Sequence, residues 1–170
     1  MRAVVCRSFD GIEALALGEF ADPVPGPGQV LVDVHAAAVS FMDTLMVAGR
    51  YQMKPALPFV PGTDAAGIVL AVGEGVHRIA VGDRVACSVW HGAMAERMVA
   101  AESSVVKLPE GIGFEIGSTV RYAYGTARYA LVERAQLRAH ESVFVSGAAG
   151  GVGMAAVDIA RRLASSGRSS

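Results

Sequence analysis

The stretch from residue 143 to residue 163 limits the possible folds of this chain more than any other part of the sequence. It begins with an apolar run in a predicted strand at 142–146, continues as a glycine-rich loop at 147–153, and ends in a predicted helix at 154–163. This order lets backbone amides at the helix N-terminus approach a pyrophosphate. The pattern indicates the first strand, loop and helix of a dinucleotide-binding unit. A glycine-rich turn without a ligand is the alternative.

The sequence after this loop does not supply the rest of such a unit. A strand–helix–strand unit takes about 30 residues or more, and the acidic residue that binds the ribose is expected about 20 residues beyond the glycines. No carboxylate follows Asp158, and residues 161–170 contain no apolar run. We therefore expect residues 161–170 to be a frayed end, and the nucleotide-binding domain to be truncated.

The first hundred residues alternate between short apolar stretches and turns. Residues 22–28 cannot be regular structure, because three prolines fix the backbone and remove hydrogen-bond donors. A short helix is predicted over 41–48, with Asp43 in its first turn, where the helix dipole favours a carboxylate. Many short strands at this spacing favour a closed or partly open β-barrel. The predicted strands are residues 2–6, 15–19, 29–39, 66–72, 93–100 and 104–108, with another that starts at the turn 81–85.

The character of the sequence changes after residues 109–111. Residues 114–135 have a helical composition, and Gly125 is predicted to break that helix. The predicted fold class is therefore mainly β with an α/β start. A barrel occupies residues 1–113, and connecting helices with an incomplete nucleotide-binding unit occupy 114–170.

Composition and charge exclude several classes of protein. Apolar residues make up 52% of the chain, which excludes a disordered chain, and the net charge of −1 leaves no basic footprint for nucleic acid. No apolar run approaches the ~18 residues that cross a bilayer. The two cysteines, Cys6 and Cys87, lie too far apart in sequence for a disulfide framework. We therefore expect a protein of the reducing cytoplasm, with no membrane or nucleic-acid partner.

A series of short motifs recurs in a fixed order along the chain. The motifs are residues 25–30, 40–44, 49–51, 59–67, 72–76, 81–85, 124–127 and 147–153. In this order they resemble the medium-chain dehydrogenase/reductase superfamily and, within it, the zinc-free quinone oxidoreductases (the zeta-crystallin-like enzymes). The resemblance runs from the N-terminus to about Leu163. It implies a GroES-like domain followed by a Rossmann domain, with NADPH-dependent reduction of quinones or activated enones; NADH is not excluded.

The residues at the superfamily's zinc positions predict that this chain binds no metal. Zinc-dependent relatives have a cysteine at the position of Ser40 and a His-Glu pair at the positions of Thr63 and Asp64. Hydroxyl groups are poor substitutes for a thiolate and an imidazole as zinc ligands. The four-cysteine lobe of those relatives is absent as well, since Cys87 has no cysteine near it in sequence.

The resemblance also implies which residues form the site. Ser40 and Tyr51 match residues that line the substrate cleft, and Thr126 matches a threonine near the nicotinamide. The alternative for Tyr51 is an ordinary loop aromatic, for Thr126 a helix residue, and for Asp43 a helix cap. The residues expected to bind the cofactor are Thr126, Gly147, Gly150, Gly151, Val152 and Gly153.

Two functions from different classes follow from these motifs. The first is an NAD(P)H-dependent oxidoreductase that passes a hydride directly to a quinone or an activated enone without zinc, with little or no activity in this short chain. The second is a catalytically silent GroES-like module that acts as an interaction protein. Self-association through the incomplete sheet fits either function, because parallel strands are normally covered on both faces.

Overall fold

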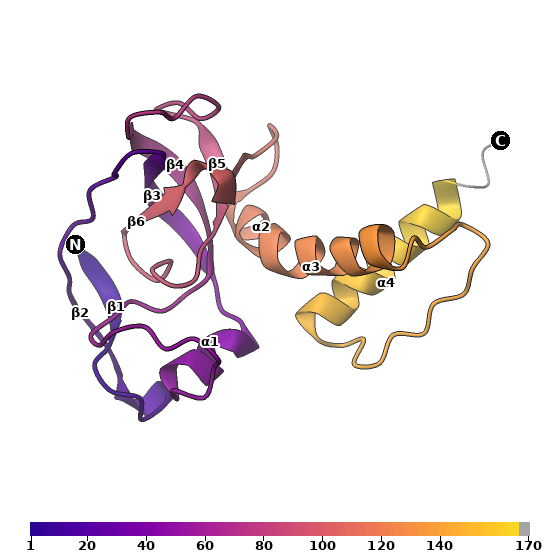
Figure 1. Cartoon of the computed structure of the whole chain (residues 1–170), viewed down its shortest axis with the longest axis horizontal. Coiled ribbons are helices and arrows are strands. Elements are labelled where there is room, and N and C mark those ends of the chain that lie inside the picture. The colour runs from indigo at the N-terminus through magenta and orange to yellow at the C-terminus, as the bar shows by residue number, and fades with distance from the viewer. Residues whose placement is uncertain (167–170) are drawn as a thin grey trace. The chain divides into compact units, whose positions relative to one another are not determined.

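The computed structural model describes residues 1–166, which divide into two compact units, Met1–Thr119 and a second that begins at Val120. The first unit contains every strand of the described chain, and the second is helical (Figure 1). The mainly β fold class is confirmed. No helix within residues 1–166 combines the length and the apolar character that crossing a bilayer requires. The domain boundary expected between residues 113 and 114 stays a prediction.

The larger sheet of the first unit is antiparallel and has the strand order β6-β3-β4-β5-β7. One face forms the core: Val30 and Val32 on β3 are fully buried, whereas their neighbours Leu31 and Asp33 are partly exposed. This alternation of apolar and polar residues predicts the strand, and it is confirmed. The strands are β3 (Gln29–Ala38), β4 (Asp64–Val72), β5 (Arg84–Ser88), β6 (Arg97–Ala101) and β7 (Val105–Lys107).

A two-stranded sheet, β1 (Arg2–Cys6) with β2 (Leu15–Glu19), completes the β-structure. The backbone N–H of Val4 donates to the carbonyl of Met94 at 2.9 Å, and the N–H of Cys6 donates to that of Phe59 at 2.8 Å. These bonds tie β1 to segments next to the larger sheet without joining the two sheets into one. The expectation of a partly open barrel is confirmed. Two 3₁₀ turns, η1 (Ile12–Ala14) and η2 (Glu102–Ser104), lie between strands.

Helix α1 (Phe41–Val47) follows β3 and confirms the predicted short helix. Its inner side chains, Met46 and Val47, are each 1% exposed and pack with Cys6 and Phe59 in a small apolar cluster. The helix ends before Gly49, whose φ of 62° is a left-handed conformation that glycine adopts without strain.

Helix α2 (Phe114–Thr119) belongs to the first unit, because it packs on β3, β4 and β5. A Cβ at Gly117 would lie 2.7 Å from Leu108 Cδ1 and 3.2 Å from the Cβ of Ala66, so glycine allows the close approach. At the start of α2, the guanidinium carbon of Arg84 lies 4.7 Å from the centre of the Phe114 ring. The helix is therefore fixed to the sheet by close packing and by a cation–π contact.

The second unit consists of four helical segments. The helix continues through Gly125, so the predicted break there is wrong. Glycine lowers helix stability by about 1 kcal/mol but leaves the backbone hydrogen bond in place. Ala127 and Ala155 are each 1% exposed, and Tyr124 donates to Asp158 Oδ2 at 3.3 Å. The segments are the π-helical η3 (Val120–Tyr124) and η4 (Tyr129–Arg134), and the α-helices α3 (Gly125–Arg128) and α4 (Gly151–Ser166).

Two predictions for the second unit are wrong. Residues 142–146 form no strand, and the side chain of Phe144 is 94% exposed. The described residues place no strand beside this segment, and a β-strand needs a neighbour for its backbone hydrogen bonds. The expected frayed end is helical up to Ser166, as part of α4; residues 167–170 lie outside the described residues.

Candidate functional site

One end of the larger sheet brings together residues that are far apart in the sequence. Ala38 at the end of β3 pairs with Asp64 at the start of β4, and Asp64 pairs with Ser88 at the end of β5. Ser40 follows Ala38 by two residues, and Thr63 directly precedes Asp64. The polar residues of the first unit's candidate site therefore gather at this end.

Ser40 is held by the carboxylate of Asp43 at the N-terminus of α1. Its backbone N–H donates to Asp43 Oδ2 at 2.7 Å, and its hydroxyl donates to the same oxygen at 2.9 Å. Asp43 is only 4% exposed. Its other oxygen, Oδ1, is buried without a hydrogen-bond partner in the described part of the chain. Asp43 therefore caps the helix, fixes the Ser40 hydroxyl and keeps one acceptor unused.

Thr63 and Asp64 form a second hydroxyl–carboxylate pair at the same end of the sheet. The Thr63 hydroxyl donates to Asp64 Oδ2 at 2.8 Å, and each residue is 2% exposed. The interpretation of the sequence treats these two residues only as poor zinc ligands, and so misses them as members of the site. A signal is present, because a Thr-Asp pair interrupts the apolar stretch 59–69, and a buried carboxylate requires polar partners.

Tyr51 lies beyond the other end of α1 from Ser40. Its backbone N–H donates to the Leu45 carbonyl at 3.2 Å, and its ring packs against the cluster that contains Met46 and Phe59. The structure thus separates the two expected substrate-side residues along the helix. Their role in a substrate cleft stays a prediction.

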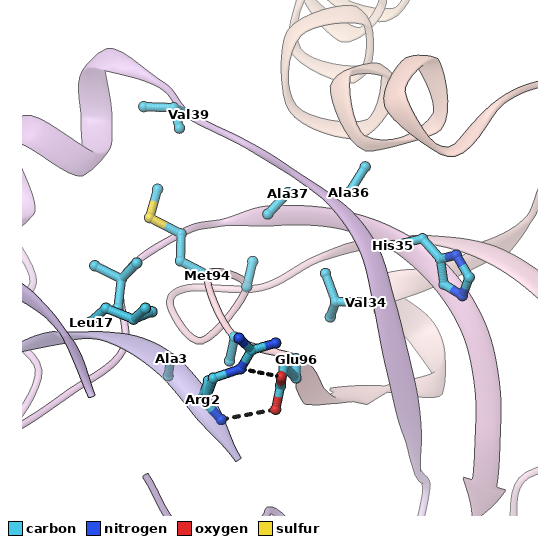
Figure 2. A pocket seen from close by; sticks show the side chains of 13 residues that line it. Arg2, Ala3, Leu17, Val34, His35, Ala36, Ala37, Val39, Met94 and Glu96 are labelled. Atoms are coloured by element: carbon cyan, nitrogen blue, oxygen red, sulfur yellow. Dashed lines mark hydrogen bonds and ion pairs between the residues drawn. The ribbon is translucent and has the colours of Figure 1, made fainter. Parts of the chain in front are cut away.

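A pocket of about 450 Å³ lies between β3 and the chain near β1 (Figure 2). Val39, the neighbour of Ser40, lies at one end of it and is 79% exposed. At the other end, Glu96 accepts bonds from the backbone N–H and from the guanidinium of Arg2, at 2.9 and 2.7 Å. The bond from the backbone N–H, followed by that from the guanidinium, lowers the pKa of Glu96. The pocket is therefore mostly apolar with one ion pair.

The glycine loop of the second unit is stabilised by hydrogen bonds before α4 begins. Gly147 has a φ of 71°, and its carbonyl accepts the N–H of Gly150 at 3.1 Å. A Cβ at Gly153 would lie 2.3 Å from that same carbonyl oxygen. The fold of the loop therefore requires glycine at positions 147 and 153.

The other glycines of the loop are not required by its own packing. A Cβ at Gly151 would meet no atom within 4 Å, and one at Gly150 would make only ordinary contact at 3.5 Å. The absence of side chains at these positions leaves the backbone open at the N-terminus of α4, where the helix dipole favours an anion. This arrangement fits the pyrophosphate of a dinucleotide. Thr126 lies exposed on α3.

The described residues contain no group of three or more His, Cys, Asp or Glu side chains placed to hold a metal ion. The two hydroxyl–carboxylate pairs at the sheet end offer Ser40 and Thr63 where a zinc site would need stronger donors.

Comparison with known proteins identifies the family. The family description "Alcohol dehydrogenase GroES-like domain" matches residues 26–136. The chain belongs to this family. Human quinone oxidoreductase is 45% identical over 163 residues, which is 95% of this chain and 50% of that protein. Quinone oxidoreductase-like protein 2 of Rattus norvegicus is 38% identical over 160 residues, which is 94% of this chain and 45% of that protein. The chain thus spans about half the length of these relatives.

Solved structures of oxidoreductases also resemble the chain closely. A probable oxidoreductase from Mycobacterium abscessus is 41% identical with a TM-score of 0.91, over 96% of this chain and 52% of that one. A quinone oxidoreductase from Thermus thermophilus, also known in complex with NADPH, is 34% identical with a TM-score of 0.82, over 96% of this chain and 50% of that one. The recognition of the chain as a medium-chain dehydrogenase/reductase of the quinone oxidoreductase type is confirmed.

Proposed function

We propose that this chain carries part of the site of an NADPH-dependent quinone or enone oxidoreductase that works without zinc. The observation that carries the proposal is the 45% identity to human quinone oxidoreductase over 163 residues, which include both the sheet-end residues and the glycine loop. The NADPH complex of the similar Thermus thermophilus enzyme favours NADPH over NADH. The substrate would be a small quinone or an activated enone.

The proposed role of the second unit is to hold the cofactor's pyrophosphate. Gly147 and Gly153 set the path of the backbone, and the open backbone at Gly150, Gly151 and Val152 would contact the phosphates. When bound, the nicotinamide supplies a hydride for an electron-poor carbon of the substrate. Thr126 is the candidate residue on the nicotinamide side.

The proposed role of the first unit is to orient the acceptor. The Ser40 hydroxyl is fixed by Asp43 at 2.9 Å, so its oxygen lone pairs are the groups that remain for a substrate or a bridging water. Fixed donors and acceptors favour catalysis because no reorganisation is needed when the substrate binds. Tyr51 would provide an aromatic wall.

We expect weak cofactor binding and little turnover from the chain by itself. No carboxylate follows Asp158 to bind the ribose, so the phosphate loop would act nearly alone. Association costs several kcal/mol before any net affinity appears, so a partial set of contacts gives a dissociation constant on the order of millimolar.

A catalytically silent GroES-like module is the second candidate. It is favoured by the extended, unpaired segment 142–146, since the first strand of a nucleotide-binding sheet is not formed there. This candidate predicts that the chain does not bind NADPH at all.

Amide chemical shifts of the purified chain during an NADPH titration test the proposal. We expect saturable shifts at Gly150, Gly151 and Val152, and their loss in Gly150→Val, with Ala164→Val on α4 as a control that keeps them. No shift at the loop up to millimolar NADPH would overturn the proposal in favour of the silent module. Oxidation of NADPH by 1,4-benzoquinone, followed by absorbance, measures turnover. A slow or undetectable rate agrees with weak binding, and rapid turnover would refute the expected low activity.

A further inference from the structure

A second pocket of the first unit contains none of the residues assigned to the proposed oxidoreductase site. It has a volume of about 340 Å³ and lies between β6, the segment that follows β2, and the loop that precedes β4. This volume is within the range of about 300–1,000 Å³ that is typical of small-molecule sites. Its lining is Met1, Phe20, Ala21, Pro23, Ala56, Pro58, Phe59, Val60, His91, Gly92, Arg97, Met98 and Val99.

The apolar part of this lining suits a flat ring. Phe20 and Phe59 supply aromatic surface, while Pro23, Pro58 and Met98 supply aliphatic and thioether surface. Aromatic rings and methionine sulfur make favourable contacts with an aromatic ligand. The size and the lining together therefore favour a single aromatic ring over a long chain.

The ionisable groups of the lining are all basic. They are the Met1 α-ammonium, the His91 imidazole and the Arg97 guanidinium; no Asp or Glu of the described chain lines the pocket. The imidazole meets the Phe59 ring edge-on, with the ring centres 5.8 Å apart, and its partial burial lowers the pKa of His91. His91 is therefore neutral near pH 7, and the positive charge comes from Arg97 and Met1.

The charge of Arg97 is only partly compensated. One guanidinium nitrogen of Arg97 donates to Asp22 Oδ1 at 3.0 Å, and the side chains of Arg97 and Asp22 are 46% and 55% exposed. Asp22 also lies 3.7 Å from the Met1 ammonium, so one exposed carboxylate serves two cations. A guanidinium has five N–H donors, and its planar fork matches a carboxylate. Arg97 can therefore accept a second carboxylate from the side of the pocket.

We infer that this pocket binds a small aromatic carboxylate, with its ring between Phe20 and Phe59 and its carboxylate on Arg97. Asp22 competes for the same guanidinium and so limits the affinity. Because the charged partners are exposed to solvent, binding is expected in the millimolar range and weakens as salt is added.

Benzoate, with benzamide as its neutral counterpart of nearly the same shape, tests this inference. Trp90 is the only tryptophan and directly precedes His91, so its fluorescence reports binding at the pocket. We expect benzoate to change the fluorescence in a saturable manner and benzamide to bind more weakly. Equal binding of the two compounds, or no saturable change, would overturn the inference.

Two variants change the affinity in opposite directions. Arg97→Gln should weaken benzoate binding about threefold, and Asp22→Asn should tighten it about twofold, as expected for charge pairs exposed to water. Both variants break the same ion pair, so a common structural effect would move both affinities in one direction and would refute the inference. Arg78→Gln, which removes an exposed arginine paired with Glu102 outside this pocket, should leave benzoate binding unchanged.

Discussion

Replacing Asp43 with alanine is expected to lower the free energy of unfolding of the first unit by about 2–4 kcal/mol. The carboxylate accepts hydrogen bonds of 2.7 and 2.9 Å from the backbone and the hydroxyl of Ser40, and it is 4% exposed. A hydrogen bond to a charged group contributes about 1.5–3 kcal/mol. Ser40 is partly exposed, so water can replace part of what its donors lose. The helix that Asp43 caps also holds Met46 and Val47 in the core.

Two matched variants make this prediction specific. Asp43→Asn keeps one acceptor oxygen without the charge and should cost about half as much as Asp43→Ala. Thr44→Ala alters the adjacent, exposed residue of the same helix and should change the free energy of unfolding by less than about 0.5 kcal/mol. Urea unfolding followed by Trp90 fluorescence measures all three variants, because Trp90 lies in the first unit.

The result separates two explanations for the carboxylate. The helix dipole alone accounts for only about 0.3–1 kcal/mol. A loss of less than about 1 kcal/mol in Asp43→Ala would therefore refute the role of the two hydrogen bonds. A loss in Thr44→Ala as large as that in Asp43→Ala would show that any change in this helix turn is destabilising.

Two further predictions concern the glycine loop and the response to acid. Gly153→Ala should destabilise the packing of α4 on its loop by about 1–3 kcal/mol, since the new Cβ would lie 2.3 Å from the Gly147 carbonyl oxygen, whereas Gly151→Ala enters open space and should not; thermal unfolding followed by circular dichroism should show this contrast. Hydrogen bonds from Lys107 and from the Ala80 backbone lower the pKa of Asp83, so its contribution to stability is present above the unfolded-state pKa and is lost as the pH falls through the lower folded-state value. The stability difference between the natural chain and Asp83→Asn should therefore shrink on acidification below about pH 4, and a difference that stays constant would contradict this cause.

Local patterns are sufficient to predict most of the first unit from the sequence. Alternation at Val30 and Val32 places β3, and the short helix follows from Ser40 and Asp43, because these signals act within a few residues of the chain. The strand at 142–146 could not be predicted reliably in the same way. Its sequence is apolar, but a strand forms only where a second strand supplies hydrogen-bond partners, and none of the described residues does so.

The candidate site shows the same limit from another direction. The resemblance places Ser40 and Tyr51 together, yet they lie beyond opposite ends of α1, and the residues that share the sheet end with Ser40 are Thr63 and Asp64. That neighbourhood depends on the cross-strand pairing of Ala38 with Asp64, which no local pattern encodes. Two buried carboxylates near one sheet end are costly to retain in an apolar core, because desolvation disfavours each charge. Their hydroxyl partners at 2.9 and 2.8 Å offset part of this cost, so the sheet end is the part of the first unit where a requirement beyond stability is most strongly indicated.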